Sequence, residues 1–142
     1  MENKNHEFWM KKALELAKKS YNKNEVPVGA LIIKNNQIIG QGHNLVNSTN
    51  QVINHAEINA ISMANKKLEN WRLLNCEIYV TLEPCVMCIG AINNSRIKKI
   101  IFGAKNNNFG AIHMINPKIT VLSGILSLEC SKLLSDFFKK IR

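Results

Sequence analysis

The stretch YVTLEPCVMC, residues 79–88, runs from an apolar strand into the start of a helix and carries two cysteines three positions apart. Pro84 fits the first turn of that helix, where proline is tolerated because the N–H that it lacks would have no helical partner. In such a turn Cys85 and Cys88 share one face of the helix, and the positive helix end favours their thiolate forms. The spacing alone fits a redox pair, a corner of a structural zinc site or half of a catalytic metal centre.

Segments on both sides of this stretch alternate between helical and strand-like patterns. Amphipathic helices are expected at residues 6–22, 55–67 and 128–140, with polar loops at 44–54 and 106–116. Short apolar strands are expected at residues 28–33, 37–43, 76–82, 97–104 and 118–124. Asn35 and Asn36 suit a tight turn, so the first two strands should form a hairpin. With no repeat and no linker, residues 1–142 are expected to form one layered α/β domain with a mixed sheet.

The charge balance favours a polyanionic partner. The 142 residues include 19 basic and 10 acidic side chains, a formal net charge of +9. Neutralising phosphates with such a surface releases counterions, which favours binding to nucleic acid. The abundance of Lys, Asn and Ile beside a single aspartate, Asp136, also indicates drift toward AT-rich codons, which accounts for part of the basicity.

The chain shows no feature of a secreted or membrane protein. Its first ten residues contain two glutamates and no apolar run, so no secretory signal is expected. The longest apolar stretch, VPVGALII, is too short to cross a bilayer. Cys76 and Cys130 stand apart in apolar surroundings and are expected in the core rather than in disulfides. We therefore expect a cytoplasmic protein without a membrane partner.

Thirty positions before Cys85, the sequence HAE supplies His55 and Glu57. His55, Cys85 and Cys88 are three ligands of the types that zinc prefers. Structural zinc sites are closed by four protein ligands, whereas catalytic sites keep a position for water. Three ligands beside a carboxylate therefore indicate a catalytic Zn²⁺, which lowers the pKa of bound water to about 7. Glu57 is then the candidate that carries the proton to the leaving group.

This interpretation imposes a condition on the backbone. Residues two apart inside a helix point to nearly opposite sides. Glu57 can therefore reach the same metal only if His55 lies at the helix boundary with non-helical backbone.

Simpler interpretations of the same residues remain open. A redox pair would leave His55 and Glu57 without a role. A structural zinc site could take His43 or His113 as a fourth ligand. Glu57 could be a solvated carboxylate at a helix start, where acids are common, and His6 is expected at the surface before the first helix.

With His-x-Glu followed by Pro-Cys-x-x-Cys, the chain resembles the zinc-dependent cytidine and nucleobase deaminases. Further blocks narrow the resemblance to the bacterial tRNA-specific adenosine deaminases. These blocks are EVPVGA (25–30), HAEI (55–58), YVTLEPCVMC (79–88), SRIKKIIFGA (95–104) and LLSDFF (133–138). They extend through nearly the whole chain and are more specific than the metal motif alone.

The resemblance implies a cytidine deaminase-like fold, a three-layer α/β/α sandwich around a five-stranded mixed sheet, and a homodimer. It implies hydrolytic conversion of adenosine to inosine, with release of ammonia, at the wobble position in the anticodon arm of a tRNA, an arginine tRNA in the family. It also implies one Zn²⁺ per subunit on His55, Cys85 and Cys88, proton transfer by Glu57, and no organic cofactor.

Substrate contacts follow from the resemblance by position. Asn44 matches the asparagine that hydrogen-bonds the flipped base, and Ala56, Asn106, Phe138 and Lys139 fall at other substrate-contacting positions. Asn106 departs from the family, which usually has an acidic residue there. The segment between Asn108 and the fifth strand is also shorter than usual in the family. The resemblance therefore defines the RNA contacts less well than the catalytic residues. Phe138, like its neighbour Phe137, suits the core equally well.

Two other functions compete with RNA editing. A small-molecule deaminase acting on guanine, cytosine or a nucleoside would use the same metal chemistry, but it has less reason for a basic surface. A non-enzymatic, zinc-stabilised nucleic-acid-binding module would not need an open metal position or Glu57. EVPVGA and the charge of +9 favour the RNA-editing deaminase.

Overall fold

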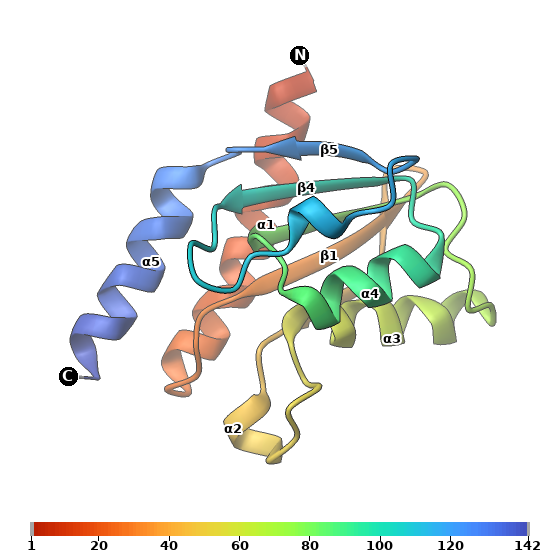
Figure 1. Ribbon diagram of the computed structural model, residues 1–142. Helices are drawn as coiled ribbons and strands as arrows, with labels where there is room; N and C mark the ends of the chain where they lie inside the picture. The colour runs from red at the N-terminus through yellow and green to blue at the C-terminus, as the bar shows by residue number, and fades with distance from the viewer. Residues whose placement is uncertain (1, 142) are drawn as a thin grey trace.

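A five-stranded mixed sheet forms the centre of the computed structural model, which describes residues 2–141 (Figure 1). Its strands are β1 (Gly29–Lys34), β2 (Gln37–His43), β3 (Cys76–Leu82), β4 (Lys99–Ala104) and β5 (Thr120–Ser123). They lie in the order β2-β1-β3-β4-β5. β1 is antiparallel to both β2 and β3, whereas β3, β4 and β5 are parallel. The predicted mixed sheet is confirmed.

The predicted hairpin joins β1 to β2. Asn35 (φ 50°) and Asn36 (φ 61°) both adopt the left-handed backbone, which asparagine tolerates better than most residues. Leu31 and Ile33 point to one face of the sheet and Ala30 and Ile32 to the other, so this strand is buried on both sides.

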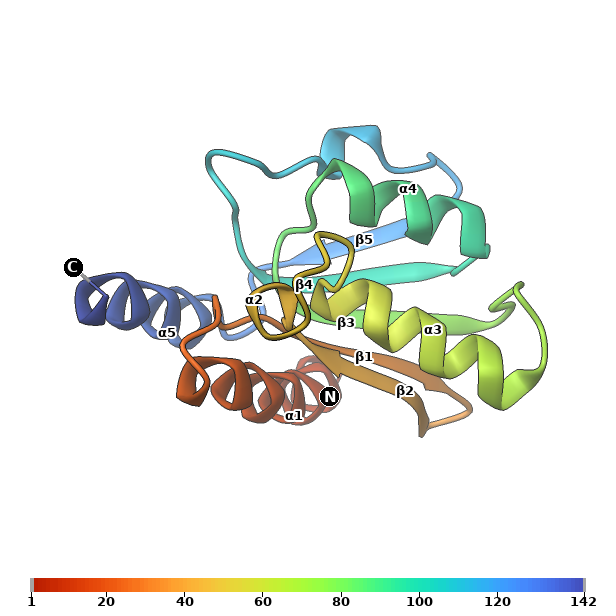
Figure 2. The same cartoon turned by 90° about the horizontal axis from the view of Figure 1, so that it is seen from below.

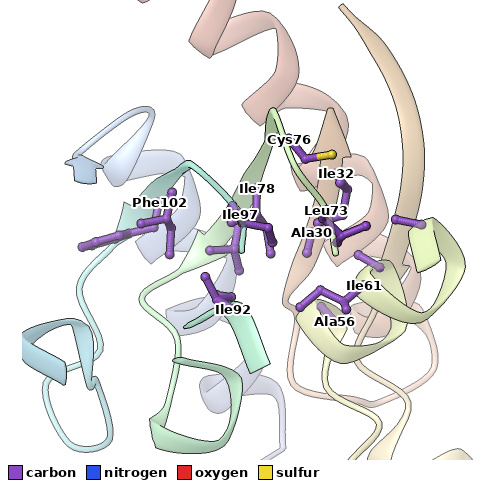
Figure 3. Close-up of a cluster of buried hydrophobic side chains, with 14 of the residues drawn as sticks. Ala30, Ile32, Ala56, Ile61, Leu73, Cys76, Ile78, Ile92, Ile97 and Phe102 are labelled. Carbon is purple, nitrogen blue, oxygen red and sulfur yellow. The ribbon is translucent and has the colours of Figure 1, made fainter. Parts of the chain in front are cut away.

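Helices cover both faces of the sheet (Figures 1 and 2). They are α1 (Glu2–Asn22) and α5 (Ser127–Lys140) on one face, and α3 (Ala56–Leu68) and α4 (Val86–Ser95) on the other. Figure 3 shows the core on the α3 and α4 side, where Ile61 and Ile92 pack against Ile78. The three-layer α/β/α sandwich implied by the resemblance is confirmed.

The backbone of β2 sets the position of α3. Ala56, Ala60 and Ala64 are fully buried on one face of the helix. A Cβ atom on Gly42 would lie 2.6 Å from the carbonyl oxygen of Ala56. Because no side chain separates the helix from the strand, the amino end of α3 is held close against the sheet, and this end carries the candidate metal ligand His55.

Three local expectations were wrong. α1 begins at Glu2, so His6 lies within the helix; its side chain is buried, and its Nδ1 lies 2.6 Å from the hydroxyl of Tyr79. α4 begins at Val86, with Cys85 as its N-cap, so Pro84 precedes the helix instead of opening its first turn. The two polar loops contain short helices, α2 (Val46–Thr49) and the 3₁₀ helix η1 (Ile112–Met114). Within residues 2–141, no helix has the length and apolarity needed to cross a membrane.

Candidate metal centre and active site

Two helix starts bring the candidate metal ligands together. His55 is the N-cap of α3 (φ −73°, ψ 156°), and Cys85 is the N-cap of α4 (φ −77°, ψ 176°). Neither side chain caps its own helix, so both can turn toward a shared point. The extended backbone at His55 meets the condition set by the His-x-Glu spacing.

The separations between the histidine nitrogen and the two cysteine sulfurs match a tetrahedral zinc site. Nδ1 of His55 lies 3.6 Å from Sγ of Cys85 and 3.5 Å from Sγ of Cys88. Tetrahedral bonds of about 2.3 Å to sulfur and about 2.0 Å to nitrogen place such atoms about 3.5 Å apart. Among residues 2–141, these three side chains form the one group of three or more His, Cys, Asp or Glu residues close enough to share a metal ion.

The proposed fourth ligands lie outside this group. Nδ1 of His43 lies 3.0 Å from Oγ of Ser20, and His113 is exposed in η1. The structure therefore gives no support to a closed structural site built on either histidine.

The protonation chemistry of the ligands also fits a cation. Burial lowers the pKa of His55, which favours the neutral imidazole that metals bind. Burial, and then the neighbouring Glu57 and Cys85, raise the pKa of the Cys88 thiol. A thiol in these surroundings becomes a thiolate ligand only when a cation compensates its charge.

Glu57 lies in the first turn of α3 and is enclosed by protein, with 4% of its surface exposed. Burial raises the pKa of its carboxyl group to about 7, while hydrogen bonds from its own backbone and from Cys88 oppose the shift. A group with a pKa near neutrality can both accept and donate a proton at the pH of the cell.

A cavity of about 340 Å³ opens beside this cluster. His55, Glu57 and Cys85 line it, and its apolar lining includes Val26 and Val28 from the EVPVGA block. An apolar cavity with a few convergent polar groups is typical of a small-ligand site.

The predicted substrate contacts fall into two sets. Asn44, Ala56 and Asn106 line the cavity. Nδ2 of Asn44 donates to the carbonyl oxygen of Val26 (3.1 Å), and its Oδ1 accepts the N–H of Val46 (3.2 Å), which leaves one N–H and one lone pair for a ligand.

Phe138 and Lys139 form the second set. They lie on α5, away from the residues that line the cavity, and 44% of the Phe138 surface is exposed. Its neighbour Phe137 is the core residue of the pair, with 3% exposed.

Sequence reasoning missed three residues in or next to the cavity lining. Glu83 and Phe109 line it, and Glu25 lies beside it, directly before Val26. Both glutamates are buried. A glutamate inside an otherwise apolar block, as in EVPVGA or TLEPC, was the signal that could have identified both acids.

A three-layer sandwich that holds His, Cys, Cys and a buried Glu around an apolar cavity defines a deaminase. The family model of the MafB19-like deaminases matches residues 4–142. The tRNA-specific adenosine deaminase of Buchnera aphidicola subsp. Schizaphis graminum is 43% identical over 150 residues, covering 100% of this chain and 99% of the relative. The chain belongs to the family of tRNA-specific adenosine deaminases.

Solved structures agree with this assignment. A tRNA:A34 deaminase, studied for A-to-I editing at the wobble position of tRNA, matches with a TM-score of 0.84 and 34% identity, covering 88% of this chain and 97% of that one. A guanine deaminase from Nitrosomonas europaea matches with a TM-score of 0.78 and 26% identity, covering 90% and 81%. Of these two structures, the tRNA deaminase has both the higher TM-score and the higher sequence identity.

Proposed function

We propose that this protein binds one Zn²⁺ per chain and hydrolyses adenosine to inosine and ammonia at the wobble position of a tRNA anticodon. The proposal rests on one observation. The His55, Cys85 and Cys88 group lies beside a cavity that Glu57 also lines, in a chain that is similar to tRNA-specific adenosine deaminases over its whole length. An arginine tRNA is the substrate that the family resemblance favours.

His55, Cys85 and Cys88 would hold the ion. Bound there, Zn²⁺ would supply a Lewis acid that makes water nucleophilic near neutral pH. Glu57 would take a proton from the water that attacks C6 of adenine and would deliver it to the ring nitrogen N1. It would then carry the proton of the added hydroxyl group to the departing amino group, which leaves as ammonia. The reaction then balances as adenosine plus water giving inosine plus ammonia.

The cavity wall would orient the base and exclude bulk water. Asn44 can present its remaining N–H and lone pair to one edge of the adenine. Val26, Val28 and Leu82 supply apolar surface for the ring. A base reaches this position only if it leaves its stack, which is least costly in a single-stranded loop such as the anticodon loop.

We also propose that the protein acts in the cytoplasm as a homodimer. Large apolar side chains are exposed on the α3, α4 and η1 side of the sandwich, namely Met63, Val86 and Met114. Contact with a second copy would remove them from water. Light scattering of the purified protein tests this assembly.

Inosine mapping tests the function. Purified protein incubated with tRNA should produce inosine at the first anticodon position, and free guanine, cytosine and adenosine should remain unchanged. Rapid turnover of a free base or nucleoside, with no inosine in tRNA, would instead establish a small-molecule deaminase.

RNA binding should weaken steeply with salt, because lysines supply phosphate contacts. Lys105 and Lys139 are exposed. Lys105→Gln or Lys139→Gln should each make the negative slope of log K against log salt less steep by about 0.7 to 0.9. Lys140 should matter less, since it already donates to the carbonyl oxygen of Tyr21 and lies 4.1 Å over its ring. Lys132→Gln is the control, because Lys132 is paired with Asp136 at 2.8 Å. Equal slopes in all four proteins would contradict the phosphate contacts.

Asn106→Asp should sharpen the preference for RNA over DNA by about tenfold, the effect of one charge-assisted hydrogen bond. Oδ1 of Asn106 accepts the N–H of Phe109 (3.1 Å), so the amide offers a ligand chiefly its Nδ2 donor. A carboxylate repels phosphate and accepts a hydrogen bond from the ribose 2′-hydroxyl, the group that distinguishes RNA from DNA. Deamination rates on matched RNA and DNA stem-loops measure the preference. An unchanged ratio would show that neighbouring contacts decide sugar choice.

A further inference from the structure

We propose that Glu83 is a positioning residue. Its carboxylate accepts hydrogen bonds from both ends of the segment of residues 105–112, a contact that we call the clasp. The clasp thereby sets where Asn106 and Phe109 meet the RNA. This proposal depends on the proposed function for the identity of the substrate. The clasp itself rests on geometry alone.

Both oxygens of Glu83 are engaged by this segment. Oε1 accepts the backbone N–H of Asn106 (3.2 Å), and Oε2 accepts the backbone N–H of Ile112 (3.1 Å). Glu83 is 8% exposed and lines the cavity. Its own N–H donates to the carbonyl oxygen of Ala104 (2.8 Å), the last residue of β4. The Glu83 side chain therefore holds both ends of the loop. Its backbone is bonded to Ala104, the residue just before the loop.

Core packing holds only the end of this loop. Ala111 is buried and Ile112 packs against the core, whereas Asn106 is half-buried and Phe109 is 74% exposed. Other hydrogen bonds in the loop run from Gly110 N to Asn106 O (3.0 Å), from Ala111 N to Pro84 O (2.9 Å) and from Phe109 N to Oδ1 of Asn106 (3.1 Å). Segments with few buried contacts are the first to open locally, so the carboxylate contributes most where core packing is least, at the Asn106 end of the loop.

Gly110 provides independent support for the clasp. A Cβ atom there would overlap the carboxylate of Glu83 and would lie 2.5 Å from the carbonyl oxygen of Asn106. The loop backbone thus passes directly over the carboxylate, and a glycine is needed for this approach.

A second buried carboxylate, next in sequence to the cavity residue Val26, makes the same kind of contact. Glu25 is 1% exposed and accepts the backbone N–H groups of Asn47 (2.9 Å) and Ser48 (2.7 Å), which belong to α2. Burial acts to raise the pKa of Glu25, but the hydrogen bonds from Ser48 and Asn47 bring it below its ordinary value, so the group is ionised. α2 lacks buried residues. Two weakly packed segments are therefore each held by one buried carboxylate that accepts two backbone N–H groups.

Glu83→Gln is the decisive variant because it keeps the shape and removes one acceptor. A glutamine has one oxygen and one NH₂ donor. Whichever way the amide turns, its NH₂ faces a backbone N–H, and one half of the clasp is lost. The KM for an anticodon stem-loop should rise about tenfold, the effect of one charge-assisted hydrogen bond. kcat at saturating RNA and zinc content should stay within a few-fold of wild type, because Glu57 and the metal ligands are unchanged.

Gly110→Ala disturbs the same contact from the loop, because its Cβ would overlap the Glu83 carboxylate. It should raise KM in the same way, and it tests the proposal if Glu83→Gln folds poorly. Glu77→Gln is the matched control: it makes the same chemical change in β3, about 20 Å along the strand from Glu83, and should leave KM unchanged.

Amide hydrogen exchange separates the clasp from the identity of the substrate. In Glu83→Gln, at least one of the N–H groups of Asn106 and Ile112, the one that loses its acceptor, should exchange about tenfold faster, while that of Gly42 in β2 should be unaffected. Unchanged exchange at both positions overturns the clasp whatever the substrate is. Faster exchange with an unchanged KM, or a fall in kcat alone, overturns the positioning role. A wild-type protein that forms no inosine in RNA refutes the proposed function, and the exchange result then decides the clasp separately.

Discussion

Glu57→Ala is expected to keep its metal and its fold and to lose deamination by about a hundredfold to ten-thousandfold, the usual contribution of a positioned acid–base group. The cavity provides no obvious substitute. Glu83, the other carboxylate that lines it, uses both oxygens to hold the segment of residues 105–112. In the proposed mechanism a proton removed from the attacking water is therefore expected to pass through Glu57, whose burial holds its pKa near neutrality.

The measurement is single-turnover inosine formation, together with elemental analysis and thermal unfolding of the same sample. Glu57→Gln is the isosteric companion, which keeps the volume of the side chain and removes its basicity. If either variant reacts within a few-fold of wild type, some other group moves the proton.

Cys85→Ala and His55→Ala are each expected to reduce bound zinc from one equivalent per chain to a small fraction and to abolish deamination. With three protein ligands, the loss of one leaves two, too few for the metal sites known in proteins of this type. The remaining buried thiol, Cys88, has a raised pKa because of burial and its neighbours. It would then hold its proton instead of binding a metal.

Cys76→Ala is the matched control for the cysteine change. Cys76 is fully buried at the start of β3, and its Sγ contacts the carbonyl oxygen of Leu74 (3.5 Å), outside the metal cluster. Removal of this side chain should cost about 1 kcal/mol of stability and leave the zinc content unchanged. Full zinc occupancy in Cys85→Ala, by elemental analysis, would refute the ligand assignment.

Local patterns in the sequence determined the order of the elements and the core of the site. The apolar runs predict all five strands, and asparagines with positive φ form the hairpin turn. The His-x-Glu spacing required an extended backbone at His55, which the structure has. These features were predictable because each depends on neighbours within about one helical turn or one strand.

Other features depended on contacts between segments distant in sequence. Whether Phe137 or Phe138 enters the core depends on how α5 turns against α1, and His6 is buried because α1 extends along the sheet to reach Tyr79. Glu83 looked like one more residue of a motif until the tertiary fold placed the N–H groups of Asn106 and Ile112 against its two oxygens. Spacing along the chain predicts which side chains share a face of a helix or strand. The role of a buried carboxylate depends instead on the hydrogen-bond donors that the fold brings to it. For Glu83 these donors lie more than twenty residues away in sequence.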